Sequence, residues 1–76
     1  MDIMCKFICT RFVDFVDKRT NNKVQGYITY VFYKDTNEII KTKMVSDCPT
    51  HFDFGDDVLV SIIINGNYAY YSFKGN

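Results

Sequence analysis

The chain has 76 residues, with nine Lys and Arg against nine Asp and Glu, and Phe and Tyr make up 17% of it. This length predicts one domain over residues 1–76 with a small core, and the zero net charge argues against a simple polybasic binder. The apolar runs are too short to span a bilayer, and no signal-peptide pattern opens the chain. We therefore expect a cytoplasmic protein that does not contact a membrane.

Apolar and aromatic residues recur in five segments separated by turn-forming clusters, which predicts five strands. The first strand is unusually long, so we expect a bend or a bulge within it. The third and fourth strands are joined by the irregular segment Ser46–Asp57, which has room for one short helical turn. The expected strands are Met4–Val16, Val24–Tyr33, Ile39–Val45, Val58–Ile64 and Tyr68–Phe73.

Two segments of the sequence predict turns of a particular conformation. Asn65-Gly66 predicts a type I′ hairpin, in which both central residues need positive φ. In the segment Phe52–Val58 we expect a Phe to pack inward before a Gly-Asp turn leads into the fourth strand. Five short strands with a longer third connection predict an all-β fold, a small closed five-stranded barrel that is OB-fold-like. An SH3-like barrel is the alternative.

Alternation along the second strand separates two sets of side chains. We expect Val24, Gly26, Ile28, Tyr30 and Phe32 to face the core, and Gln25, Tyr27, Thr29, Val31 and Tyr33 to face outward. On the third strand, Lys41 and Lys43 must reach water, so Ile40 and Met44 are expected in the core.

These assignments gather aromatic and basic side chains on one outer surface. Rings there stack on bases and cations follow phosphates, which is typical of proteins that bind single-stranded nucleic acid. The alternative is that the tyrosines are ordinary strand formers and the lysines ordinary solubilising residues. The predicted surface consists of Arg11, Tyr27, Tyr33, Lys41 and Lys43.

The charges support a basic region in the first part of the chain. Residues 1–43 carry eight Lys and Arg against five acids, whereas residues 44–76 carry one Lys against four Asp. In the polar turn of residues 18–23, Lys18, Arg19 and Lys23 are placed to contact a phosphate backbone. Both features are also compatible with a merely solvated surface.

The run Thr10–Thr20, followed by Gly26-Tyr27, Tyr30 and Gly55-Asp56 before Val58, resembles small single-stranded DNA-binding proteins of phages and mobile elements. These proteins are similar to the gene V protein of filamentous phages. The resemblance implies an OB-fold, a homodimer, a role in DNA replication and sequence-independent coating of single strands. By position it points to Arg11, Arg19, Lys23 and Tyr27. The chain departs from the pattern at Phe12, where a basic residue is expected.

We predict no enzyme activity, no cofactor and no metal. The only histidine is His51, and no Gly-rich phosphate loop or nucleophile with its base is recognisable. Cys5, Cys9 and Cys48 are an odd number without zinc-ligand spacing, which indicates reduced thiols.

Two functions of different classes remain open. The first is binding of single-stranded DNA or RNA by the aromatic and basic surface. The second is a phage- or mobile-element-encoded protein-interaction module that inhibits a host or defence protein, with Asp53, Asp56 and Asp57 imitating nucleic acid. A purely structural subunit ranks third.

Overall fold

The computed structural model describes residues 1–49 and 52–75, and these form one antiparallel sheet of five strands. The predicted all-β fold is confirmed. The expected helical turn is not found in residues 46–49 or 52–57, and the predicted position of His51 lies outside the described residues. The strands are β1 (Asp2–Asp17), β2 (Asn22–Tyr33), β3 (Glu38–Lys41), β4 (Asp57–Asn65) and β5 (Tyr68–Gly75).

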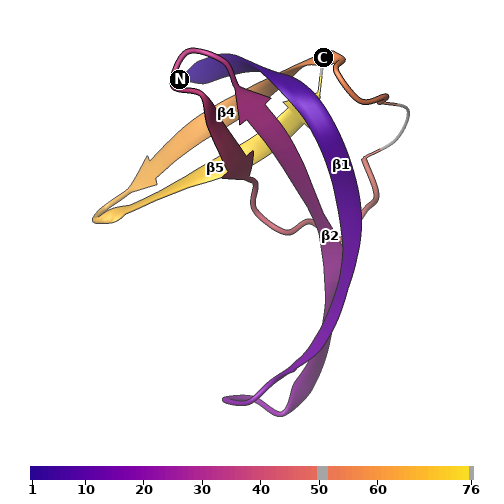
Figure 1. The fold of residues 1–76 in the computed structure, drawn as a ribbon. Helices are drawn as coiled ribbons and strands as arrows, with labels where there is room; N and C mark the ends of the chain where they lie inside the picture. The colour runs from indigo at the N-terminus through magenta and orange to yellow at the C-terminus, as the bar shows by residue number, and fades with distance from the viewer. Residues whose placement is uncertain (50–51, 76) are drawn as a thin grey trace.

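The strand order is β3-β2-β1-β4-β5, with β1 in the centre. The sheet curls into a small barrel that stays partly open (Figure 1), a form compatible with the OB-fold. After the end of β3 the chain approaches β5, and the Lys43 N–H donates to the Tyr71 carbonyl at 2.7 Å. The edges of β3 and β5 are not joined as a strand pair, so the closed barrel that we expected is not formed.

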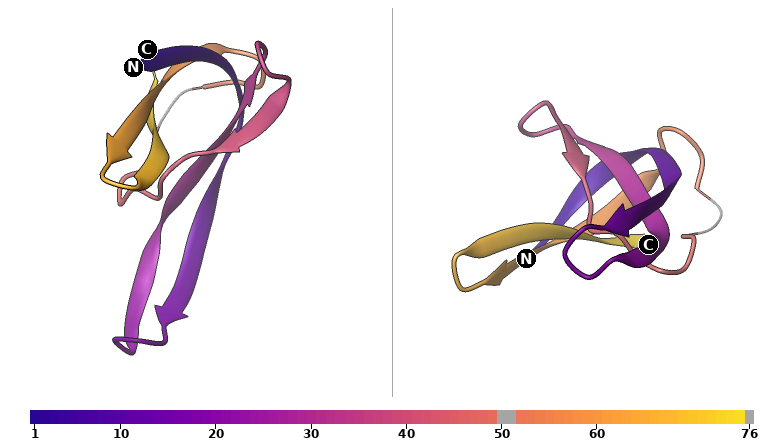
Figure 2. Two further views of the ribbon diagram at one scale, coloured as in Figure 1. Left: turned by 90° about the vertical axis from the view of Figure 1, so that its left-hand side faces the viewer. Right: turned by 90° about the horizontal axis from the view of Figure 1, so that it is seen from below.

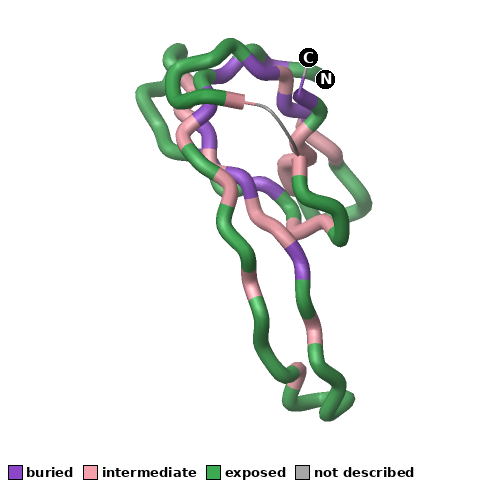
Figure 3. Tube along the Cα trace, turned by 90° about the vertical axis from the view of Figure 1, so that its right-hand side faces the viewer, coloured by how far each residue is buried: buried purple, intermediate pink, exposed green. Residues whose placement is uncertain are grey.

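Beyond the barrel, β1 and β2 continue together as a hairpin arm that ends in the turn of residues 18–21. The left-hand view of Figure 2 shows this arm extending away from the other strands. Buried residues are concentrated in the barrel, and the tip of the arm is exposed (Figure 3). We call residues 10–29 the β1–β2 arm.

The core lies on the inner side of the curled sheet. Ile3, Cys5, Phe7, Val31, Ile40, Val58 and Val60 are buried there. The rings of Phe7, Phe52 and Phe73 pack beside them, with centroids 5.4–6.2 Å apart. The expected inward Phe of the segment before β4 is thus Phe52, which packs against the core.

The predicted faces of β2 are reversed in the structure. Val31 is fully buried and Thr29 is 2% exposed, so their set faces the core and the set of Tyr30 faces outward. The Thr29 hydroxyl is 3.0 Å from the Thr10 hydroxyl, and the Thr42 hydroxyl donates to the Thr29 carbonyl at 2.8 Å. Buried polar groups normally have such hydrogen-bond partners.

A bulge in β1 sets the boundary between barrel and arm. Phe7 pairs with Val31 and Cys9 pairs with Tyr30, so Ile8 is the extra residue. The bend or bulge that we predicted in this strand is confirmed. Because an extra residue shifts the alternation, Phe7 faces inward before the bulge and Thr10 faces inward after it.

Two further expectations are corrected. Met44 lies against Gly26, on the side of β2 opposite to Val31, and not in the core. The β4–β5 hairpin turns at Gly66-Asn67, because Asn65 pairs with Tyr68. Of these two turn residues, Gly66 has positive φ, at 62°, and Asn67 does not, which matches a type II′ turn and not type I′.

Candidate nucleic-acid interface

The strand register places an aromatic and two cationic side chains together on the outer side of β1, β2 and β3. Tyr30 pairs with Cys9 on one side and Lys41 on the other, and Arg11 pairs with Ile28 in the adjacent outward row. Residues paired across antiparallel strands share a face. We call this surface the outer face; it consists of Cys9, Arg11, Ile28, Tyr30, Phe32, Ile39 and Lys41.

One end of the outer face is hollowed into an apolar groove of about 580 Å³. This volume lies within the roughly 300–1,000 Å³ range of small-ligand sites. Almost all atoms that line the groove are apolar, and among the residues that the structure describes Lys6 is the single charged one in its lining. The lining residues are Lys6, Phe7, Ile8, Phe32, Ile39, Phe54 and Gly55.

Phe54 reaches this groove from a tight turn before β4. The Asp56 N–H donates to the Asp53 carbonyl at 3.0 Å, and Gly55 has φ 91° at the third position, as in a type II turn. The turn is tied to β1 by two backbone hydrogen bonds of 2.8 Å, from Gly55 N–H to Phe7 O and from Phe7 N–H to Asp56 O.

Of the predicted site residues, Arg11 and Lys41 lie on the outer face and are exposed. Tyr27 does not lie there, because it shares the inner side of β2 with Thr29. Its ring meets Phe12 edge-on at 5.4 Å, and its backbone pairs with Val45. The structure therefore separates Tyr27 from the cations with which it was predicted to act.

Tyr33 is also on the inner side of β2, half-buried against the core. Burial raises the pKa of its phenol, and the nearby Asp35 carboxylate raises it further. Tyr33 also lines a polar cavity of about 410 Å³ whose walls include Lys34 and Asp57. The expected outward position of Tyr33 is wrong, because it belongs to the same inward set as Val31.

Lys43 lies beyond the end of β3, where the chain approaches β5. Its ammonium is 5.3 Å from the centre of the Tyr70 ring, a cation–π contact. Arg19 and Lys23 lie on the β1–β2 arm and are exposed. The backbone N–H of Arg19 donates to Asp17 Oδ1 at 3.0 Å, and Lys23 Nζ is 3.8 Å from Asp14 Oδ2. The seven predicted residues thus fall into several regions.

Sequence reasoning missed Tyr30 and Phe32, although a usable signal was present. Lys41 has to reach water, and a hairpin that turns over residues 34–37 pairs Tyr33 with Glu38 and therefore Tyr30 with Lys41. Because paired residues share a face, that register assigns Tyr30 to the outer side.

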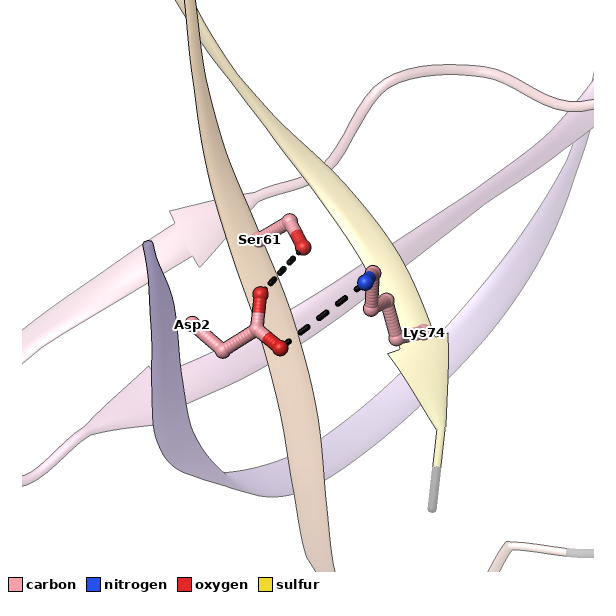
Figure 4. A network of polar contacts seen from close by, with 3 residues as sticks. All are labelled: Asp2, Ser61 and Lys74. Atoms are coloured by element: carbon pink, nitrogen blue, oxygen red, sulfur yellow. Dashed lines mark hydrogen bonds and ion pairs between the residues drawn. The ribbon is translucent and has the colours of Figure 1, made fainter.

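The acidic residues near the site are engaged in local contacts. Asp57 Oδ1 is 2.6 Å from Lys6 Nζ, and Asp56 Oδ2 accepts a hydrogen bond from the Asp53 N–H at 2.8 Å. At the other side of the barrel, Asp2 lies between the Ser61 hydroxyl and the Lys74 ammonium (Figure 4). The Ser61 hydrogen bond, assisted by Lys74, lowers the pKa of the Asp2 carboxyl.

Within residues 1–49 and 52–75, no group of three or more His, Cys, Asp or Glu side chains is arranged to hold a metal ion. The described part of the chain also has no helix with the length and apolar character needed to cross a bilayer. Searches of protein-family models, curated proteins and solved structures find no match to this chain.

Proposed function

We propose that the protein binds single-stranded nucleic acid on the outer face. The observation that carries this proposal is the common placement of Arg11, Tyr30 and Lys41, which the register of β1, β2 and β3 brings to one side of the sheet. Bases stack on aromatic rings with roughly 1–3 kcal/mol each, and cations contact the phosphates between them. In OB-folds the second and third strands carry the ligand.

The chemistry of this surface favours binding without sequence preference. Reading a base requires hydrogen-bonding groups that match its edge, such as the amides of Asn and Gln. The outer face has none of these amides. Its cations, Arg11 and Lys41, are the groups that contact phosphates in this proposal, and its other side chains are aromatic, aliphatic or, at Cys9, a thiol. Every base has a stacking surface, so affinity should depend little on base identity.

Fluorescence anisotropy with labelled oligo-dT and oligo-rU tests the proposal at several salt concentrations. For single strands, the logarithm of the affinity falls with the logarithm of salt concentration with a slope of about −0.7 for each phosphate contact. Wild-type binding should therefore weaken with salt, and Lys41→Ala should make the slope shallower by about 0.7. Tyr30→Ala should weaken binding and leave the slope unchanged.

A matched control removes the same residue types elsewhere. Tyr68→Ala with Lys74→Ala changes an exposed ring and a cation on β5, away from the outer face, and should leave binding unchanged. If Tyr30→Ala with Lys41→Ala binds as tightly as this control, the outer face is not the interface. Absence of binding by the wild type at low salt would contradict the function itself.

The β1–β2 arm is proposed as a second contact for the strand. Arg19 and Lys23 are exposed near its tip, at a distance from the barrel that lets them reach further phosphates of a bound strand. Phosphate contacts position a ligand without reading its sequence. Arg19→Ala should therefore lower the affinity for oligonucleotides that are long enough to reach the arm more than the affinity for short ones.

A second candidate function is a protein-interaction module. The β4–β5 hairpin exposes Ile64 (75%) and Tyr68 (79%) near its tip, on opposite faces because Ile64 pairs with Ala69 and Tyr68 pairs with Asn65. Exposed apolar groups are typical of interfaces. A host protein or a second copy of the chain is the proposed partner. Light scattering at micromolar concentration and a pull-down, each with wild type and Ile64→Ser, separate these possibilities from nucleic-acid binding.

A further inference from the structure

Phe54 is held in an exposed position by a turn that has little freedom. The turn is closed by hydrogen bonds between Asp53 and Asp56 and fastened to Phe7 by two more, yet the Phe54 residue is 81% exposed. A ring so exposed contributes little to the core. Its fixed placement is what a contact surface for a ligand requires, because little ordering entropy is lost on binding.

The groove beside Phe54 continues the outer face. Ile8, Phe32 and Ile39 line it from β1, β2 and β3, and Phe54 lines it from the turn. Ile39 is 69% exposed, so the wall that β3 contributes is also open to a ligand. The groove is therefore a gap between two exposed apolar side chains above a sheet surface.

The charges around the groove indicate which ligand it takes. Lys6 lines the groove with its ammonium 2.6 Å from Asp57 Oδ1, and Lys41 lies two residues from Ile39 on the same face. No acidic residue is among the described residues that line the groove. An apolar site with a cationic rim suits a ligand that combines a flat apolar group with negative charge. A nucleotide unit within a single strand has both properties, and its base needs no hydrogen-bonding partner to stack.

We propose that this groove is a base-stacking subsite, in which a nucleobase of a bound single strand stacks on the Phe54 ring over Phe32 and Ile39. The proposal rests on the proposed function and adds the position of a base to it. The phosphates on either side of that base lie toward Lys6 and Lys41. Because the lining offers almost no polar atoms, the subsite accepts purines and pyrimidines alike.

The absence of tryptophan in the chain provides a direct assay. The F54W variant carries a single indole at the subsite. The matched Y68W variant carries one at the tip of the β4–β5 hairpin, where Tyr68 is 79% exposed. Titration with oligo-dT or oligo-dA should quench the fluorescence of F54W by stacking and leave that of Y68W unchanged. Anisotropy of a labelled oligonucleotide on the same samples measures binding independently.

Affinity supplies a second readout. Phe54→Ser should weaken oligonucleotide binding by about 5- to 150-fold, the loss of one stacked base. Its salt slope should equal that of the wild type because no phosphate contact is removed. Circular dichroism of Phe54→Ser should match the wild type, since an exposed ring is removed.

The outcomes separate the subsite from the proposed function. Oligonucleotide binding that leaves F54W fluorescence unchanged and is unaffected by Phe54→Ser overturns the subsite and retains the function. No binding by the wild type overturns both. Quenching of F54W that depends on protein concentration without oligonucleotide would identify a second copy of the chain as the occupant and overturn the proposal.

Discussion

Gly26 is the position in β2 where one added methyl group should most directly disturb the packing of residues 44–45 on this strand. A Cβ at this residue would lie 2.7 Å from Met44 Cγ, 2.7 Å from the Val45 carbonyl oxygen and 3.0 Å from Met44 Sδ. Ordinary contact begins near 3.4 Å, so the Val45 carbonyl would have to move by about 0.7 Å. That carbonyl accepts the Tyr27 N–H at 2.7 Å, and the movement would weaken this bond.

The expected effect of Gly26→Ala follows from three contributions. Overpacking costs about 1–3 kcal/mol and a weakened hydrogen bond about 0.5–1.5 kcal/mol. The lower entropy of the unfolded chain with Ala offsets about 0.4–1 kcal/mol. The free energy of unfolding should fall by about 0.5–4 kcal/mol, which lowers the Tm of a domain this size by about 2–32 °C.

Urea unfolding followed by tyrosine fluorescence, together with thermal unfolding followed by circular dichroism, measures the change. Gly26→Ala combined with Met44→Ala serves as the companion, because it removes the side-chain contacts and leaves the carbonyl contact. Partial recovery relative to the two single variants would show that both neighbours resist the methyl group. A Gly26→Ala protein as stable as the wild type would refute the close packing of residues 44–45 on β2.

Two further predictions concern the reactivity of the thiols and the loss of stability at low pH. Cys9 and Cys48 are exposed, whereas Cys5 is buried, and burial raises the pKa of the Cys5 thiol. A thiol reagent should therefore modify Cys9 and Cys48 quickly and Cys5 only at the rate of unfolding. Rapid reaction of all three thiols in the native protein would contradict this. The lowered pKa of Asp2 contributes stability that is present above its ordinary value of 3.8 and lost as pH falls through the folded value. The Tm difference between wild type and Asp2→Asn should therefore be present at pH 6 and shrink below about pH 4, and a difference independent of pH would contradict the linkage.

The existence of the five strands could be predicted from the sequence because strands depend on local patterns. The expected end of the third strand at Val45 was wrong, since β3 ends at Lys41, and the expected type of the turn at Gly66 was wrong as well. The segments before and after Gly66 are rich in apolar and aromatic residues, and the observed β4 and β5 extend beyond the predicted ends by only one or two residues. The long first strand indicated a bulge, and the structure places it at Ile8. Local pattern did not specify that position, because it depends on how β1 pairs with β2.

The faces of β2 could not be predicted from alternation, because both sets of side chains mix apolar and polar groups. The buried set includes Thr29, whose polar atoms are satisfied by Thr42 and Thr10 from other segments. A single-strand pattern contains no information about those partners. The candidate site moved with the faces, from Tyr27 and Tyr33 to Tyr30 and Phe32, while Arg11 and Lys41 kept their predicted place on the outer side.

The central position of β1 has a consequence for the order of folding. Its pairing with β2 closes over the local turn of residues 18–21, but Ile3, Cys5 and Lys6 pair with residues of β4. From Asp17 to Asp57 the ribosome must add roughly 40 residues, which at about 5–20 residues per second takes several seconds. During this interval one edge of an apolar strand stays unpaired, so we expect the nascent chain to be most prone to aggregation before β4 emerges.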